Sequence, residues 1–263
     1  MHYLLRALLA ILVALTLIAP AFALDLGSNI TIYDENSSTD SGWYSAQEDD
    51  EVEPGMVGDQ KWDLEGFFLE KNSLSMVGGY NFADGYGGYT TGDIFLSTST
   101  PTYGPSSLSG VQGNVATTWA YGYNYVLDLN VSSTGQLILD GAGQGNYQVF
   151  LIDDSANLLT AKYLQNEGSS PWQYEDGGAL VDAGSFSFFE NVADTGFAGD
   201  THYLLTGFDL SFLGHGTEFY SHFTMGCGND NLMGQGTVVP EPSTFLLFGV
   251  GAGLVWLTRR RKL

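Results

Sequence analysis

The sequence predicts an all-β fold: a single β-sandwich or jelly-roll-like domain, followed by a C-terminal transmembrane sorting helix. Glycine occurs 35 times and aromatic residues make up 14% of the chain, a composition that suits short strands joined by tight turns. The body lacks long helical repeats of Ala, Leu, Glu and Lys, and its short apolar runs end at Gly, Asn, Asp or Ser. Regularly spaced short strands of this kind are typical of sandwiches and jelly rolls.

Several segments carry the alternating or apolar pattern of a strand. The pattern is clearest at 125–131. The segments 203–213 and 218–225 flank a Gly-His-Gly turn, so we expect them to pair as a long hairpin. The segment 158–164 fits either a helical turn or a strand. The expected strands are 64–69, 73–77, 93–98, 125–131, 136–139, 147–152, 186–189, 203–213 and 218–225.

Residues 1–23 have the pattern of a secretory signal peptide. A short apolar core at 8–18 is followed by Ala21 and Ala23, which frame an A-x-A cleavage site. We expect export through the Sec translocon and cleavage by signal peptidase, so that the acidic all-β extracellular domain spans 24–238. An uncleaved anchor is the alternative, although the apolar core is short for a span of about 20 residues.

Residues 239–263 combine three elements in a fixed order. Pro240, Glu241 and Pro242 come first, and the two prolines hold Glu241 on a stiff, extended stretch. An apolar segment at 244–258 follows, which we expect to enter the inner membrane. A basic cluster then stops transfer and stays on the cytoplasmic side. The cluster comprises Arg259, Arg260, Arg261 and Lys262.

This tripartite end resembles the PEP-CTERM sorting signal. Proteins with that signal are substrates of exosortases, membrane-embedded cysteine proteases or transpeptidases of Gram-negative bacteria that make extracellular polysaccharide. The resemblance implies a transient inner-membrane anchor, a cut by an exosortase near Pro240-Glu241-Pro242, and delivery to the cell surface or extracellular matrix. An ordinary anchor that is never processed is the alternative.

The body resembles a family of exosortase-dependent surface proteins in four stretches, at 76–79, 91–96, 171–174 and 222–230. The last, His-Phe-Thr-Met-Gly-Cys-Gly-Asn-Asp, is the most specific. Members of that family are all-β extracellular proteins without an assigned biochemical activity. The resemblance therefore implies a fold and a location but supplies no catalytic residue.

The charge of the body excludes one class of partner. Between residues 24 and 239 the chain holds three lysines, no arginine and 29 carboxylates, a net charge of about −26. Nucleic-acid binding needs Lys and Arg to displace counterions, so we expect no nucleic-acid partner. A strongly acidic surface instead keeps an exported protein soluble.

Candidate metal ligands are few, and we expect no cofactor, with calcium as an open alternative. Asp34, Asn36 and Asp40 alternate in an acidic loop, and Asn229 and Asp230 form a second oxygen cluster. Such oxygens suit calcium, but solvated turns explain both stretches equally well.

Nitrogen and sulfur ligands give a weaker signal. The spacing of His202, His215, His222 and Cys227 matches no usual zinc signature. Cys227 is the only cysteine, so the body has no internal disulfide, and we expect this thiol to be buried.

The function expected from these features is that of an exported structural or adhesive protein in exopolysaccharide or biofilm, a substrate rather than an enzyme, with no catalytic residues. Two alternatives stay open. A carbohydrate-binding module would stack sugars on aromatic rings, and Trp172 lies in a loop-like stretch that could expose it. A jelly-roll glycoside hydrolase would need two facing carboxylates, for which the candidates are Glu175, Asp176, Glu190 and Glu218.

Overall fold

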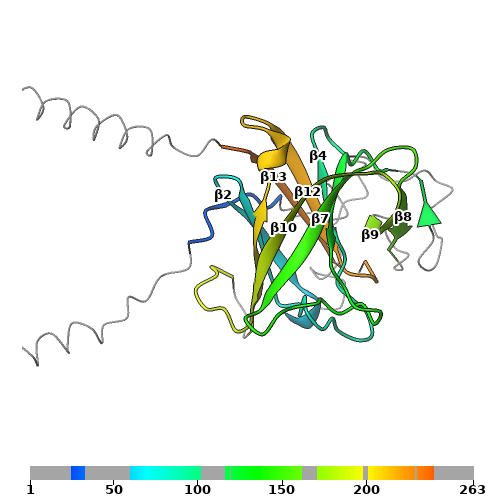
Figure 1. The fold of residues 1–263 in the computed structure, drawn as a ribbon. Helices are drawn as coiled ribbons and strands as arrows, with labels where there is room; N and C mark the ends of the chain where they lie inside the picture. The colour runs from blue at the N-terminus through cyan, green and yellow to red at the C-terminus, as the bar shows by residue number, and fades with distance from the viewer. Residues whose placement is uncertain are drawn as a thin grey trace, which may run out of the picture.

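The computed structural model describes residues 25–32, 60–101, 116–118, 120–161, 171–197, 201–228 and 230–239. These residues form the all-β body that the sequence predicts (Figure 1). The strands are β1 (Ser28–Asn29), β2 (Leu64–Glu70), β3 (Ser73–Gly78), β4 (Ile94–Ser97), β5 (Ala116–Thr117), β6 (Tyr125–Leu129), β7 (Gln144–Leu151), β8 (Asn157–Thr160), β9 (Pro171–Asp176), β10 (Ala179–Phe189), β11 (Tyr203–Asp209), β12 (Glu218–Thr224) and β13 (Asn231–Thr237).

The helices of the described residues are two short 3-10 turns, η1 (Gln60–Trp62) and η2 (Ser211–Leu213). Neither is long or apolar enough to cross a bilayer. The signal peptide predicted at 1–23 and the membrane segment predicted at 244–258 lie outside the described residues.

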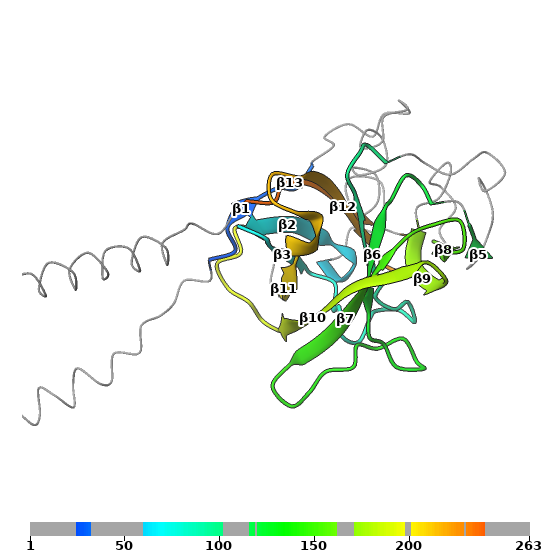
Figure 2. The ribbon, with the colours of Figure 1, turned by 45° about the horizontal axis from the view of Figure 1, so that its top comes forward.

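The strands form one large and one small sheet. Ten strands pair in the order β1-β2-β3-β11-β10-β7-β6-β4-β12-β13, and a smaller sheet has the order β5-β8-β9. All of the pairings are antiparallel. Figures 1 and 2 both show β8 and β9 lying to one side of the curled large sheet.

The large sheet curls until both of its edges meet the N-terminal segment. The N–H of Ile30 donates to Phe67 O of β2 (2.9 Å), and the N–H of Ile32 donates to Met233 O of β13 (3.0 Å). The segment thus joins the first and last long strands and covers edges that would otherwise be open. The halves of the curled large sheet face each other across the core, which gives the all-β, sandwich-like body that the sequence predicts.

The main core fills the inside of this sheet, and β2 to β4, β6, β7 and β10 to β13 all contribute to it. Aromatic rings occupy much of the space. Phe208 stacks on Phe186 with centroids 5.2 Å apart and meets Tyr147 edge-on at 5.3 Å, and Phe82 meets Phe223 edge-on at 5.7 Å. Each such pair adds about 0.5–1.5 kcal/mol beyond its burial.

Two smaller apolar clusters lie on the outer face of the sheet. Phe68, Val77 and Leu204 point outward from β2, β3 and β11 and pack with residues 192–197. On the other half, Phe95 and Val126 belong to a cluster that includes Leu158 of the small sheet. The covering segments therefore complete the fold by removing outward-facing apolar side chains from water.

The long hairpin predicted for 203–213 and 218–225 is wrong. β11 pairs with β3 and β10, whereas β12 pairs with β4 and β13. The predicted turn exists, because Gly214 and Gly216 both have positive φ. However, η2 precedes it and redirects the chain to the opposite half of the sheet, so the two neighbouring segments become distant strands.

Three other segments refine the prediction. The stretch 136–139 contributes a single bridge, Leu137 to Val131, rather than a strand. The described part of the ambiguous segment at 158–164 overlaps β8 (Asn157–Thr160) and is therefore a strand up to Thr160. The stretch expected to be a loop around Trp172 is β9, which begins at Pro171, a residue acceptable at the start of a strand.

Candidate functional site

The described fold ends one residue before the predicted sorting motif. Val238 is fully buried; its N–H donates to Thr217 O (3.0 Å), and its carbonyl accepts from Gly216 N–H (2.8 Å). The N–H of Val239 donates to Lys71 O (3.3 Å), while its side chain is half exposed. The body therefore holds the chain up to Val239 and leaves no spacer before the motif.

The N-terminal segment joins the body at the same end. Gly27 has φ +80°, and a Cβ there would lie 2.3 Å from Leu69 O, so only glycine fits. Figures 1 and 2 show the first and last described residues on the same side of the molecule. We call this end the exit pole and define it as the β2–β3 turn at 70–72 together with the turn at 214–217.

Most of the predicted site residues lie outside the described part of the chain. They are Ala21, Ala23, Asp34, Asn36, Asp40, Asn229, Pro240, Glu241, Pro242, Arg259, Arg260, Arg261 and Lys262. Asp230 is described and buried, and its Oδ2 accepts the N–H of Leu64 at 2.6 Å. Within the described ranges, no group of three or more His, Cys, Asp or Glu side chains could hold a metal ion.

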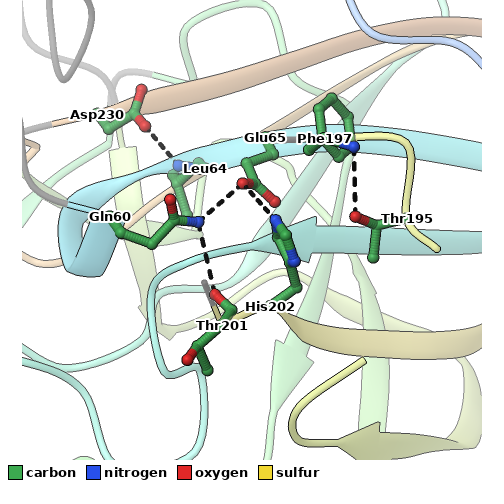
Figure 3. A network of polar contacts seen from close by, with 8 residues as sticks. All are labelled: Gln60, Leu64, Glu65, Thr195, Phe197, Thr201, His202 and Asp230. Carbon is green, nitrogen blue, oxygen red and sulfur yellow. Dashed lines mark hydrogen bonds and ion pairs between the residues drawn. The ribbon is translucent and has the colours of Figure 1, made fainter. Parts of the chain in front are cut away.

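Glu65 of β2 and His202, just before β11, form a buried pair (Figure 3). Their Oε1 and Nε2 atoms lie 3.0 Å apart, and the two side chains are 3% and 8% exposed. The Gln60 amide also donates to Oε1 (2.9 Å). Burial raises the pKa of Glu65 to about 8, because the hydrogen bond from Gln60 does not offset the loss of water. The carboxyl group is therefore mostly protonated at neutral pH, and the pair is shielded from solvent.

A second buried carboxyl group, Asp93, joins the small sheet to the large one. Its Oδ1 accepts the N–H of Leu129 and its Oδ2 accepts the N–H of Tyr174, both at 2.8 Å. Burial, followed by the nearby charge of Asp128, raises the pKa of Asp93 well above its usual value. Burial likewise raises the pKa of Asp128 to about 6. The two hydrogen bonds of Asp93 make it a structural brace.

The histidines and the cysteine are not brought together as ligands. His202 contacts Glu65, His215 is exposed, and His222 is fully buried on β12. The ring nitrogens of His222 lie 3.0 Å from Met233 Sδ and 3.0 Å from Pro171 O. Burial lowers the pKa of His222 to about 4, so this ring is neutral and structural.

Cys227 is buried among the core residues, as the sequence predicts. Its position beside an apolar core gives it the role of a small packing residue.

Trp172 does not provide the exposed ring that a sugar-stacking surface would need. Its side chain is buried, and its indole N–H has no hydrogen-bond partner among the described residues. A second tryptophan, Trp62, is half-buried and lies edge-on against Tyr86 and Tyr89, with centroids 4.8 and 6.0 Å away. Of the two alternatives for Trp172, exposure for sugar stacking or packing in the core, the structure shows packing.

The four carboxylates considered for hydrolysis lie near the ends of three different strands. Glu175 and Asp176 end β9, Glu190 follows β10, and Glu218 begins β12; all four are exposed. Asp176 accepts a hydrogen bond from the Asn157 amide (2.6 Å).

We expect the body to be more stable at pH 5 than at pH 8, by several degrees in melting temperature. Protonated Glu65 and Asp128 contribute stability that is complete below their unfolded pKa values and is lost as pH rises through about 8 and 6. His222 acts oppositely, because its contribution is lost as pH falls from 6.5 through about 4. Between pH 5 and pH 8, the change in stability from the two carboxyl groups is larger than the opposite change from His222. Thermal melts followed by circular dichroism at pH 5, 6.5 and 8 measure this, and Glu65→Gln should flatten the decline above pH 6.5. A lower melting temperature at pH 5 than at pH 8 would contradict the assignment.

The fold and its boundary define an acidic, closed β domain whose C-terminal segment continues beyond the folded body. That segment is a sorting signal: the family model of the PEP-CTERM protein-sorting motif matches residues 238–262. The match confirms the resemblance of the C-terminal segment to that signal and implies exosortase-dependent export through the cell envelope to the surface. Comparisons with curated proteins and with solved structures gave no match.

Proposed function

We propose that this chain is a surface or matrix protein of a Gram-negative bacterium, released from the inner membrane when an exosortase cuts near Pro240-Glu241-Pro242. One observation carries the proposal. The matched motif begins at Val238, the last buried residue in the part of the chain that the structure describes. A cut after Val239 would remove the anchor and leave every described hydrogen bond of the body in place. In this proposal the protein is the substrate of the enzyme and needs no cofactor of its own.

A structural or adhesive role in exopolysaccharide is supported by one face of the body. Gln144, Asn146 and Gln148 point outward from β7, because the residues between them are buried. Ser187 and Ser185 of β10 lie opposite the first two. This patch offers amides and hydroxyls beside Asp128 of β6, which lies opposite Gln148, and such groups suit the hydroxyl groups of a polysaccharide.

We expect the replacement of Gln144, Asn146 and Gln148 by alanine to reduce binding to the host exopolysaccharide about tenfold. Each lost hydrogen bond contributes about 0.5–1.5 kcal/mol. Retention on immobilised polysaccharide, with and without calcium, measures the effect. The matched control replaces Glu175, an exposed residue of the small sheet, by alanine. Equal retention of the triple variant and the natural protein would remove this face from the proposal.

Replacing Glu241 by alanine should abolish release and leave the protein in the membrane fraction. Glu241 is the charged residue held between two prolines, so it is the group in this motif with which the enzyme can form an ion pair. Fractionation and mass spectrometry of the C-terminus measure the outcome. Glu190→Ala, at an exposed site outside the motif, should be released normally. Extracellular protein that still carries Arg259 to Lys262 would refute processing.

A further inference from the structure

The distance between the fold and the membrane is short. Residues 240–243 separate Val239 from the predicted membrane segment at 244–258. Fully extended, the steps from residue 239 to residue 244 span about 17 Å. The headgroup layer takes up about 5–7 Å of this distance. While the chain is anchored, the exit pole therefore lies within roughly 10–12 Å of the bilayer surface.

An enzyme that binds Pro240-Glu241-Pro242 must fit into this gap. The motif follows Val239 directly in the sequence, and the body holds that point of the chain, because Val238 is buried and the N–H of Val239 is bonded to Lys71 O. The surface around the active site of the enzyme must then touch the part of the domain from which the chain emerges. That part is the exit pole, residues 70–72 and 214–217.

Lys71 gives this pole a specific chemistry. It is one of three lysines in a body of 29 carboxylates, and its side chain is half exposed, with Nζ 3.8 Å from Glu70. Its φ is +60°, a left-handed conformation that costs an L-residue about 1–2 kcal/mol and that glycine would adopt without strain. A charged residue held in such a conformation at the point of exit indicates a role beyond the turn.

We propose that the exit pole is a docking surface for the outer face of the processing enzyme, with Lys71 pairing with a carboxylate of that partner. This inference rests on the proposed function. The folded domain then takes part in its own processing, because it presents the motif and also contacts the enzyme beside it. Recognition extends beyond the sorting segment to a surface that only the folded body assembles.

The test is the rate of processing of the full chain, followed by pulse-chase labelling in a host that contains the enzyme. Lys71→Glu should slow processing about fivefold, because a reversed charge at a contact mainly lowers the association rate. Lys61→Glu, a matched change at another exposed lysine, should have no effect. Lys71→Gly relieves the strained turn and so preserves the fold, yet it should also slow processing. Normal rates for both Lys71 variants would overturn the proposal.

A spacer distinguishes docking from damage to the motif. Ten Gly/Ser residues inserted between Val239 and Pro240 add a flexible reach of about 17 Å and should make the rates of Lys71→Glu and the natural residue equal. A persistent difference would overturn docking at the pole. The proposed function fails separately, if the natural chain is not processed at all.

Lipid headgroups are the other surface within reach of the pole. The enzyme and the full chain can be reconstituted in phosphatidylcholine vesicles and in vesicles that also contain phosphatidylglycerol. Docking on the enzyme predicts the same slow rate for Lys71→Glu in both. A defect confined to the anionic vesicles would assign Lys71 to the headgroups and overturn the proposal.

Discussion

Replacing Asp93 by alanine should lower the free energy of unfolding of the body by about 3–5 kcal/mol. The side chain is fully buried and accepts the N–H groups of Leu129 and Tyr174 at 2.8 Å each. Alanine would leave both donors without an acceptor, at about 1–3 kcal/mol for each. Urea denaturation of the secreted body, followed by circular dichroism, measures the change.

Two further variants distinguish the effect of the hydrogen bonds on stability from the effect of the charge. Asp93→Asn keeps one acceptor oxygen and the shape, so we expect it to lose less stability than the alanine variant. Asp128→Asn removes a neighbouring charge that raises the pKa of Asp93, and it should leave the protein as stable or make it more stable at pH 8. A loss below about 1 kcal/mol for Asp93→Ala would show that water replaces the carboxyl group.

The same substitution should loosen the small sheet selectively. The backbone N–H of Asp93 donates to Trp172 O of β9 (2.8 Å), and its side chain holds Tyr174 of the same strand. Asp93 is thus attached to β9 through both main chain and side chain. Hydrogen exchange should rise first in β8 and β9 and later in β6 and β7, since local opening follows the contacts that are lost.

The strands were predicted where the local pattern is strong. The alternation at 125–131 yields β6, and the apolar run at 64–69 yields β2. β13 was missed because its sequence, Asn-Leu-Met-Gly-Gln-Gly-Thr, has two glycines and little alternation. Its strand conformation comes from pairing with β12 along its whole length, a tertiary effect that overrides weak propensity.

The burial of the polar groups could not be predicted from the local sequence. Glu65 lies in the run Leu-Glu-Gly-Phe-Phe and reads as an outward-facing residue of a strand. Only its contact with His202, 137 positions away in the chain, shows that it is buried. Asp93 likewise begins the predicted strand 93–98, and nothing in its local sequence indicates that its carboxyl group is buried. The sorting motif could be predicted because its order along the chain is itself the signal, whereas these pairs depend on which strands become neighbours.

A second large loss of stability is expected when the N-terminal segment, which closes the sheet, is removed. A secreted body that lacks residues 24–32 should lose about 5 kcal/mol of stability and self-associate. The truncation removes the pairing of β1 with β2, the hydrogen bonds of Ile30 and Ile32 to the two flanking strands, and buried Leu26. Backbone hydrogen bonds contribute about 0.5–1.5 kcal/mol each and a buried leucine about 1.5–3.

Self-association follows from the geometry as well as from lost stability. Without residues 28–32, β2 and β13 present unpaired N–H and carbonyl groups, which are templates for pairing with another copy. Light scattering on size-exclusion fractions measures the mass, and urea denaturation measures the stability. The control is Thr31→Ala, which keeps the backbone seam and loses only the hydroxyl that accepts the Phe67 N–H (2.9 Å); it should stay monomeric and lose about 1 kcal/mol. A truncated body that stays monomeric with an unchanged denaturation midpoint would show that the seam contributes nothing to the closed sheet.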